Sequence, residues 1–291
     1  MNFIQRLKGY FSSDDEKPHD EKLYAPLKQA LLNNDYQTSS AWPEEYNKGI
    51  IFTLNRCGII CAYLNPAQKA FIDFAKNSPG PLVDIGCAYG VATRPAIANG
   101  GQIIAIDSSP EHLAILENSL PHIWKNQLQT INKYFPSQAV LPSGSVSGIL
   151  ASYIFPFLTP DEFEAGLACC YDWLMPGGTL WVTQSSLNLS PGTPLQKRYN
   201  ERKAAAEKWP GLIDNYHDYL DEGWQKILPN NINFVEMEEM LSLLTNTGFE
   251  IVASDYYTLG FWQHLDADIN DKGSYYIFAR KPGTSNKNQS S

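Results

Sequence analysis

The sequence lacks the features that mark a membrane-spanning, metal-binding or nucleic-acid-binding protein. Its longest apolar runs fall well short of the ~20 residues that a membrane-spanning helix needs. Its 22 lysines and arginines are outnumbered by 31 aspartates and glutamates, so the net charge is -9 and there is no basic footprint for nucleic acid. Of the five cysteines, Cys57 and Cys61 lie one helical turn apart, but no nearby histidine pair completes a zinc site, so core packing is the better interpretation of them. We therefore expect no bound metal, no nucleic-acid partner and no stable membrane insertion.

The composition favours one globular protein from a reducing compartment. At 291 residues, with 43% hydrophobic and 18% charged residues, the chain fits one enlarged domain or one domain with an insertion. An odd number of cysteines is typical of free thiols, so we expect a cytoplasmic location. The first 11 residues are too short and too charged for a secretory signal peptide, and residues 1–22 are expected to form a flexible arm.

One short stretch, residues 82–98, has the pattern of a ligand-binding turn. Its apolar run at residues 82–85 predicts a buried strand with Asp84 near the end. Gly86 and Gly90 predict a tight turn, and apolar residues at helical spacing follow. Small residues in such a turn let backbone N–H groups and the start of a helix approach a ligand closely.

A second acid follows the next predicted strand, where Asp107 can hydrogen-bond both hydroxyls of a ribose. These two strand ends predict a nucleoside site. The dinucleotide fingerprint Gly-x-Gly-x-x-Gly nevertheless fails at two of its three glycines, because Ala88 and Val91 follow Gly86 at its spacing. The carboxylate of Asp84 at the mouth of the turn would also repel a pyrophosphate. A nicotinamide-dependent oxidoreductase therefore stays only as an alternative.

The turn instead resembles motif I of the class I S-adenosylmethionine-dependent methyltransferases, acid-x-Gly-x-Gly-x-Gly. It stands here as Asp84-Ile85-Gly86-Cys87-Ala88-Tyr89-Gly90, with alanine at the middle glycine. Alanine adds one methyl group and needs no positive φ where the backbone is ordinary. The resemblance covers residues 81–281 in motif order. It includes the segment Leu174-Met175-Pro176-Gly177-Gly178-Thr179-Leu180, which is expected to end a helix and turn into the fifth strand.

The resemblance implies S-adenosylmethionine as the cofactor and gives roles to particular residues. Asp84 would hold the methionine ammonium, and Asp107, with Ser108 beside it, would bind the ribose hydroxyls. Asn132 and Phe135 are the candidates for adenine, because the loop after the third strand contains no acid. The expected cofactor-binding residues are Asp84, Gly86, Cys87, Ala88, Gly90, Asp107, Ser108, Asn132, Phe135, Ala151 and Tyr153.

Strands and helices alternate from residue 81, which predicts a doubly wound, mostly parallel α/β sheet. Strands are expected at residues 82–85, 102–106, 127–132, 146–153, 180–182, 248–252 and 273–279, and helices at residues 91–98, 110–120, 159–174 and 235–245. The resemblance implies the seven-stranded, Rossmann-like methyltransferase fold for residues 81–281. A helical cover at residues 23–80 would precede this core, an insertion at residues 186–234 would follow the fifth strand, and residues 282–291 would form a disordered tail.

Aromatic clusters supply the expected acceptor site. The fourth strand continues into an aromatic wall, and no Asn-Pro-Pro-Tyr motif of base methylation is present. The expected acceptor-binding residues are Tyr46, Tyr63, Tyr153, Phe155, Tyr216, Trp224 and Trp262. His217 and His264 lie within aromatic clusters and are the candidates for a general base. The other histidines, His19, His112 and His122, are interpreted as surface or helix-face residues.

These patterns favour a methyltransferase that acts on a small, partly apolar molecule, with an oxygen, nitrogen or carbon nucleophile. Aromatic lining together with acidic charge supports that class of acceptor. Two further alternatives stay open, namely a non-catalytic cofactor-binding or partner-binding protein on the same fold and a methyltransferase of protein side chains. The sequence does not predict an oligomeric state.

Overall fold

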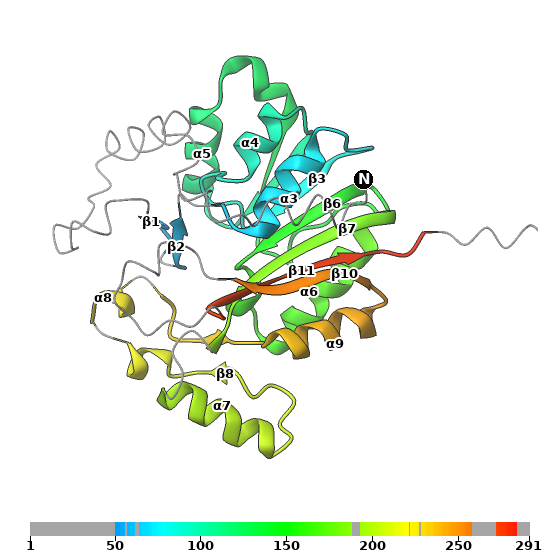
Figure 1. Ribbon diagram of the computed structural model, residues 1–291. Coiled ribbons are helices and arrows are strands. Elements are labelled where there is room, and N and C mark those ends of the chain that lie inside the picture. Colours follow the sequence, from blue (N-terminus) through cyan, green and yellow to red (C-terminus); the bar gives the residue numbers. More distant parts are fainter. Residues whose placement is uncertain are drawn as a thin grey trace, which may run out of the picture.

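The computed structural model describes residues 50–55, 57–61, 64–187, 193–220, 222–226, 228–257 and 272–283 (Figure 1). Tyr46, Tyr63, Trp262 and His264 of the expected site lie outside the described residues, as do the arm at residues 1–22 and most of the tail at residues 282–291. No helix in the described part of the chain combines the length and the apolar composition that a bilayer crossing demands.

Seven strands form the central sheet, in the order β10-β11-β7-β6-β3-β4-β5. Their bounds are β3 (Leu82–Ile85), β4 (Ile103–Asp107), β5 (Leu128–Asn132), β6 (Val146–Ser152), β7 (Leu174–Ser185), β10 (Glu250–Tyr257) and β11 (Ser274–Arg280). Neighbouring strands from β7 to β5 pair in parallel, whereas β11 is antiparallel to both β7 and β10. The expected doubly wound, mostly parallel sheet of seven strands is confirmed.

Helices cover both faces of this sheet (Figure 1). One face packs against α3 (Pro66–Ala75), α4 (Thr93–Ala98) and α5 (Pro110–Ser119), and the other against α6 (Pro160–Trp173) and α9 (Met237–Thr247). Successive residues of a strand alternate between the two apolar clusters, as Leu82 and Val83 or Ile149 and Leu150 do. Both faces of the sheet are therefore buried, and ligands can reach it only along its edges.

A β-hairpin stands where the sequence predicted a helical cover. β1 (Ile50–Phe52) and β2 (Ile59–Cys61) pair antiparallel, so within the described part of residues 23–80 only α3 is helical. Pairs of isoleucines on both sides favour strands. Between them, the Thr53 N–H donates to the Gly58 carbonyl at 3.1 Å, and Gly58 has a φ of +121°. That glycine lets the chain reverse direction.

The Pro-Gly-Gly segment also differs in detail from its expected form. α6 ends at Trp173, and β7 begins directly with Leu174. Pairing with β6 jumps from Leu174 opposite Val146 to Thr179 opposite Gly148, so the segment between bulges out of the ladder. The segment therefore forms an irregular start of the fifth strand instead of a separate turn.

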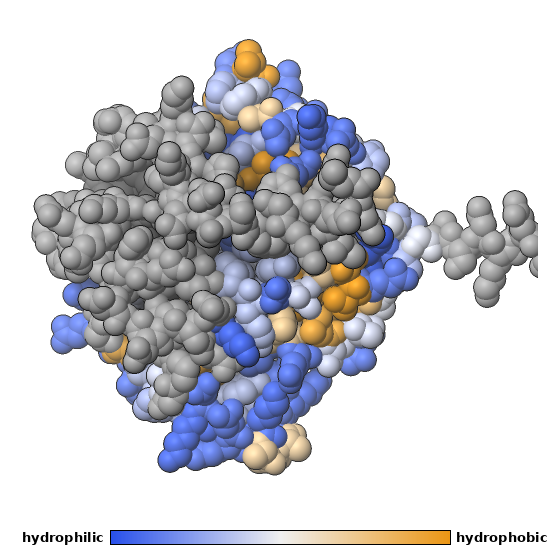
Figure 2. Space-filling view, viewed as in Figure 1, coloured by the Kyte–Doolittle hydropathy of each residue, from blue (hydrophilic) through white to orange (hydrophobic). Residues whose placement is uncertain are grey.

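The insertion after β7 is a small unit at the carboxyl ends of the strands (Figure 1). It comprises α7 (Pro194–Ala204), β8 (Leu212–Ile213), the 3-10 helix η5 (Tyr216–Tyr219), α8 (Glu222–Gln225) and β9 (Ile232–Asn233). β8 and β9 pair antiparallel, and the unit has its own apolar cluster, which includes Leu187, Tyr199 and Phe234. Figure 2 shows hydrophilic residues over α7, so the insertion turns a polar side to solvent.

Gly90→Ala should destabilise the protein, because Gly90 has a φ of +77° and a Cβ there would overlap Cδ1 of the buried Leu116. We expect a loss of roughly 2–3 kcal/mol in the free energy of unfolding, from a left-handed alanine combined with overpacking. Gly100→Ala is the matched control, since Gly100 has a φ of +96° but no atom within 4 Å of the Cβ position. The control should lose only about 1 kcal/mol. Equal losses in chemical denaturation would contradict the packing role of Gly90.

Candidate active site

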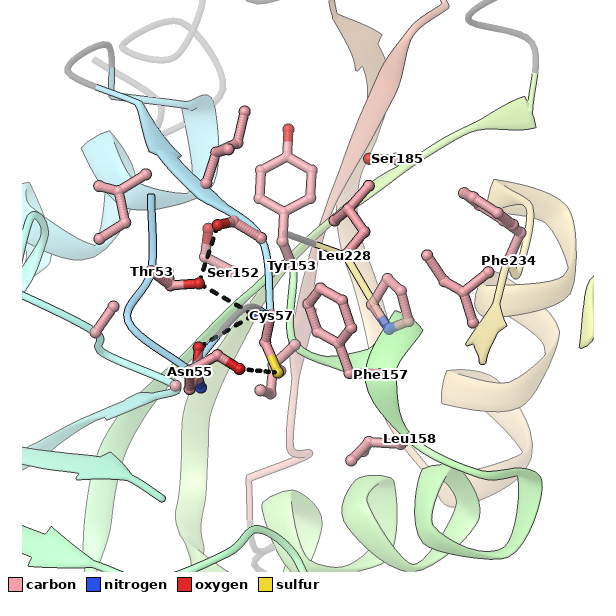
Figure 3. Close-up of a pocket in the computed structure, with 18 of the residues that line it drawn as sticks. Thr53, Asn55, Cys57, Ser152, Tyr153, Phe157, Leu158, Ser185, Leu228 and Phe234 are labelled. Carbon is pink, nitrogen blue, oxygen red and sulfur yellow. Dashed lines mark hydrogen bonds between the residues drawn. The ribbon is translucent and has the colours of Figure 1, made fainter. Parts of the chain in front are cut away.

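A cavity of about 870 Å³ opens at the carboxyl ends of β3, β4, β6 and β7. Its wall combines the turns after these strands with the β1–β2 hairpin and the insertion. In Figure 3 the hairpin residues Thr53, Asn55 and Cys57 lie on one side of it, and Phe157, Leu228 and Phe234 lie on the other. Ligands of open α/β sheets bind at this edge, so the cavity is the candidate site.

Asp84, the next-to-last residue of β3, lies in the wall of the cavity and is only 4% exposed. Thr93 Oγ1 donates a hydrogen bond of 2.6 Å to Asp84 Oδ2. The pKa of Asp84 is raised to about 7, mainly because the carboxyl is buried; the hydrogen bond from Thr93 lowers it, and the charge of Asp107 contributes to the rise. An ionised Asp84 is therefore unfavourable without a cation, and a cationic ligand group would relieve that cost.

Asp107 is the last residue of β4, the strand that pairs with β3, and is 6% exposed. Three donors from the protein surround its carboxylate. The N–H of Ala88 donates to Oδ2 at 2.9 Å, the N–H of Ser109 donates to Oδ1 at 2.9 Å, and His112 Nδ1 lies 3.1 Å from Oδ1. The position of this acid is thus fixed by both the motif I turn and the start of α5.

The motif I turn has a strained backbone that its surroundings hold in place. Gly86 has a φ of +65°, and a Cβ there would lie 2.8 Å from Cδ1 of Ile154. Ala88 has a φ of +45°, so the alanine at this position of the motif adopts a left-handed backbone, not an ordinary one. The fully buried Tyr89 accepts the Leu54 N–H on its hydroxyl at 3.0 Å, which ties the hairpin to the turn. Gly90 packs on Leu116 and does not line the cavity.

Of the two residues predicted to contact adenine, Asn132 at the end of β5 and Phe135 after it, only Phe135 lines the cavity. Asn132 does not line the cavity, because its Nδ2 donates to the Asp107 carbonyl at 3.1 Å and so joins β5 to β4. Phe135 reaches the cavity but is 5% exposed and packs against Trp173 and Phe155, with ring centroids 5.8 and 6.4 Å away. Tyr134 also lines the cavity and is 37% exposed, which leaves more of its ring available for stacking.

The turn after β6 presents Tyr153 and Phe157 to the cavity. Tyr153 has a φ of +56°, a strained conformation for an aromatic residue. Its hydroxyl lies 2.6 Å from that of Tyr257 and 3.0 Å from Ser274 Oγ, which holds the ring from the antiparallel edge of the sheet.

Two expected site residues, Ala151 in β6 and Phe155 in the turn after it, are buried away from the cavity. Phe155 is fully buried against Phe163, with ring centroids 4.7 Å apart, because the 3-10 helix η3 (Phe155–Phe157) directs it into the core. Ala151 is fully buried in the same cluster. Phe157 takes the place on the wall that the sequence analysis gave to Phe155.

The insertion closes the far side of the cavity with apolar and aromatic residues. The proposed acceptor-binding residues Tyr216 and Trp224 line it, together with Tyr219, Leu228 and Phe234. His217 does not line the cavity. Its Nε2 donates to the Leu228 carbonyl at 2.8 Å, so this histidine braces the insertion. Of the two histidines predicted as candidate bases, His217 therefore does not face the cavity, and His264 lies outside the described residues.

The charged residues of the described wall are mostly acidic. They are Asp84, Asp107 and Asp218, with Lys133 the one lysine or arginine and His112 the one histidine among the described lining residues. No group of three His, Cys, Asp or Glu side chains in the described part of the chain is placed to hold a metal ion. The acidic charge of the described wall suits a cationic ligand group in the polar half of the cavity and a neutral or cationic ligand in its apolar half.

Comparisons with known proteins agree with this architecture. A family model described as a methyltransferase domain matches residues 82–178. The carboxy-S-adenosyl-L-methionine synthase of Erwinia tasmaniensis is 30% identical over 108 residues, which are 35% of this chain and 43% of that protein. The mitochondrial ubiquinone biosynthesis O-methyltransferase of Mus musculus is 24% identical over 187 residues, 62% of this chain and 45% of that protein. The chain thus spans less than half the length of these curated relatives.

Solved structures share the fold at low sequence identity. An S-adenosylmethionine-dependent methyltransferase from Mesorhizobium loti is 17% identical, with a TM-score of 0.54 over 74% of this chain and 97% of that one. The Burkholderia thailandensis 1,6-didemethyltoxoflavin-N1-methyltransferase, solved with 1,6-didemethyltoxoflavin and S-adenosylhomocysteine, is 16% identical. Its TM-score is 0.51 over 93% of each chain. At these identities the likeness establishes the fold.

Asp84→Asn should make the protein more stable at neutral and alkaline pH. A carboxyl whose pKa rises from 3.8 to about 7 on folding favours the folded state while it is protonated, and it loses that advantage as the pH rises from about 4 to 7. The variant escapes the loss, so it should gain a few kcal/mol above pH 7, with about 4 kcal/mol as the upper bound from the two pKa values. Below pH 4 the two proteins should be closely similar. Parallel curves of unfolding free energy against pH would contradict the burial of an ionisable Asp84.

Proposed function

We propose that the chain is a class I S-adenosylmethionine-dependent methyltransferase that transfers a methyl group to a small, neutral or cationic, partly apolar molecule; the match of residues 82–178 to a methyltransferase domain supports this membership. S-adenosylmethionine is the cofactor that goes with this membership. The observation that carries the proposal is one cavity that joins two buried carboxylates, Asp84 and Asp107, to an aromatic half supplied by the insertion. The curated relatives extend well beyond the matched region, so the activity and the acceptor are proposals.

The residues of the polar half fit the cofactor chemically. Asp84 is a buried carboxylate that lacks a cationic partner among the described residues, which suits the ammonium of the methionine moiety. Asp107 keeps acceptor capacity for a ribose hydroxyl. The small residues Gly86 and Ala88 line the cavity and leave room for close approach. A volume of about 870 Å³ lies near the upper end of the ~300–1,000 Å³ that ligand pockets span, which leaves space for an acceptor.

The proposed mechanism relies on positioning. S-adenosylmethionine supplies a methyl group activated by a sulfonium, so the transfer requires little help for the leaving group. Asp84 and Asp107 would fix the amino-acid and ribose ends, with Cys87 and Ser108 beside them on the wall. Tyr153, held by Tyr257, would separate the two halves of the cavity. Alignment of this kind can contribute roughly 7–11 kcal/mol to lowering a barrier.

The aromatic half supports a particular class of acceptor. Tyr216, Tyr219 and Trp224 offer rings for an apolar or planar molecule, and Asp218 is the charged group beside them. An anionic acceptor would meet three carboxylates and only Lys133 as a fixed cation among the described lining residues. Neutral molecules and amines are therefore favoured over carboxylates and phosphates.

The likeness to carboxy-S-adenosyl-L-methionine synthase raises a second candidate, the handling of a carboxylated cofactor. A carboxylate ligand needs a basic partner, and the same acidic wall weighs against it. The non-catalytic alternative and the protein side-chain alternative are separated from the proposal by turnover, not by the shape of the cavity.

Binding of S-adenosylhomocysteine should weaken as the pH falls below 7. Its ammonium pairs with the ionised form of Asp84, whose pKa is about 7, so the association constant should drop by up to about tenfold per pH unit below that value. Isothermal titration calorimetry at several pH values measures this. 5′-Methylthioadenosine, which lacks the amino-acid group, should show no such dependence, and Asp84→Asn should flatten the curve for S-adenosylhomocysteine. Identical slopes for the two ligands would remove Asp84 from the ammonium site.

Methyl transfer can be tested with trideuteromethyl-labelled S-adenosylmethionine and three pools of small molecules, neutral, cationic and anionic. Mass spectrometry should find the label in the neutral or cationic pool. Trp224→Ala should then raise the KM for the labelled acceptor about tenfold through lost apolar contact, while the affinity for S-adenosylhomocysteine stays within about twofold. Label only in anions would contradict the charge argument. Normal cofactor binding without transfer to any pool or to protein would favour the non-catalytic alternative.

A further inference from the structure

His112 is buried at the ribose end of the cavity, although the sequence analysis placed it on a surface or helix face. It lies in the first turn of α5, is 1% exposed, and is among the residues that line the cavity. Its backbone N–H donates to the cap residue Ser109 at 3.3 Å, and its ring packs edge-to-face on Tyr89 with centroids 5.0 Å apart. The ring is therefore held in one orientation beside Asp107.

The contact with Asp107 determines which nitrogen of the neutral ring carries the proton. An ionised carboxylate only accepts, so Nδ1, at 3.1 Å from Asp107 Oδ1, is the donor. Nε2 of the neutral ring is then an acceptor. It is buried and has no hydrogen-bond partner among the described residues. A buried polar atom without a partner is destabilising, so a ligand donor at this place would be favourable.

The Asp107 carboxylate has too few free acceptor sites to bind both hydroxyls of a ribose. A carboxylate offers about four lone-pair sites, and the donors from Ala88, Ser109 and His112 occupy three of them. A ribose diol brings two O–H donors. Asp107 has one site left, so one hydroxyl remains without an acceptor unless a neighbouring group supplies it. His112 Nε2 is an unpartnered acceptor on the imidazole ring whose other nitrogen contacts Asp107.

We infer that His112 is a cofactor-binding residue, whose Nε2 accepts a hydrogen bond from one ribose hydroxyl of the adenosyl moiety while Asp107 accepts from the other. The inference rests on the proposed function. It adds to the proposed cofactor site a residue that belongs neither to motif I nor to the end of β4, where Asp107 lies. Asp107 and His112 then act as a pair, in which the carboxylate selects the tautomer that makes Nε2 an acceptor.

The test combines variants of His112 with ligands that lack one hydroxyl. The ligands are S-adenosylhomocysteine and its 2′-deoxy and 3′-deoxy analogues, measured by isothermal titration calorimetry. His112→Asn keeps an amide near the Nδ1 position, able to donate to Asp107, and has no atom near the Nε2 position. His112→Gln instead places an amide near the Nε2 position. Thermal denaturation of each variant without ligand shows whether it is folded.

In the wild-type protein, each deoxy analogue should bind at least about fivefold more weakly than S-adenosylhomocysteine. In His112→Asn, removing one of the two hydroxyls from the ligand should weaken binding less than twofold, because its partner on His112 is already gone. Removing the other hydroxyl should still weaken binding about fivefold, because Asp107 is intact. His112→Gln should restore part of the lost sensitivity. Such coupling between a side chain and one hydroxyl would not arise if His112 only supported the fold.

Two results would overturn the inference, and they differ in what else they affect. If S-adenosylhomocysteine binds the wild-type protein but both hydroxyl losses are unchanged in His112→Asn, the inference fails and the proposed function stands. If S-adenosylhomocysteine does not bind the wild-type protein, the proposed function fails and the inference fails with it.

Discussion

The hydrogen bond from the Ala88 N–H to Asp107 Oδ2, at 2.9 Å, connects the two strand ends on which the site depends. It holds Ala88 in a left-handed backbone, at a φ of +45°, which an isolated alanine would disfavour by roughly 1–2 kcal/mol. The turn around it is fixed from three directions, by Ile154 against Gly86, by the Leu54 N–H on the Tyr89 hydroxyl, and by Thr93 on Asp84. A strained residue persists where its surroundings determine its position in this way.

The same bond gives Asp107 a structural role besides its proposed binding role. One carboxylate positions the motif I turn through Ala88, begins α5 through Ser109, and orients the ring of His112. Asn132 adds a bond to the Asp107 carbonyl from β5. The polar half of the cavity is therefore rigid before any ligand binds, and little ordering entropy would be lost on binding.

Much of the fold could be predicted from the sequence, because its strands are short apolar runs separated by clear turn residues. Residues 82–85 and 102–106 fall on β3 and β4 almost to the residue. The β1–β2 hairpin was missed because apolar residues at 50–51 and 59–60 suit a helix face and a strand equally, and only the pairing decides. A resemblance that begins at residue 81 carried no information about it.

The sequence predicted which residues face the cavity where a polar side chain stands at the carboxyl end of a strand, as Asp84 and Asp107 do. The site was not predictable where a short helical turn sets the direction of a side chain. The run of aromatic residues after β6 does not reveal that η3 buries Phe155 and exposes Phe157 to the cavity. His112 was missed for a related reason. Helical periodicity places it on a face, but only the fold brings the start of α5 over the end of β4.

The two halves of the cavity have different physical demands. The polar half contains two buried carboxylates, and the raised pKa of Asp84 reflects both its burial and the neighbouring charge of Asp107. That arrangement is unfavourable alone and becomes favourable with a cation, which matches an amino-acid ammonium. The aromatic half is built by the insertion and by η3, on elements outside the strands that hold the acids. On the proposed function, substitutions in the insertion would change acceptor choice without altering the residues proposed to bind the cofactor.

A crystal structure with S-adenosylhomocysteine is the most direct test of this account. We expect one ribose hydroxyl within hydrogen-bond distance of the Asp107 carboxylate and the other within hydrogen-bond distance of His112 Nε2, with the amino-acid group beside the Asp84 carboxylate. An adenosyl group bound elsewhere, or either carboxylate turned away from the ligand, would contradict the assignment of this cavity as the cofactor site.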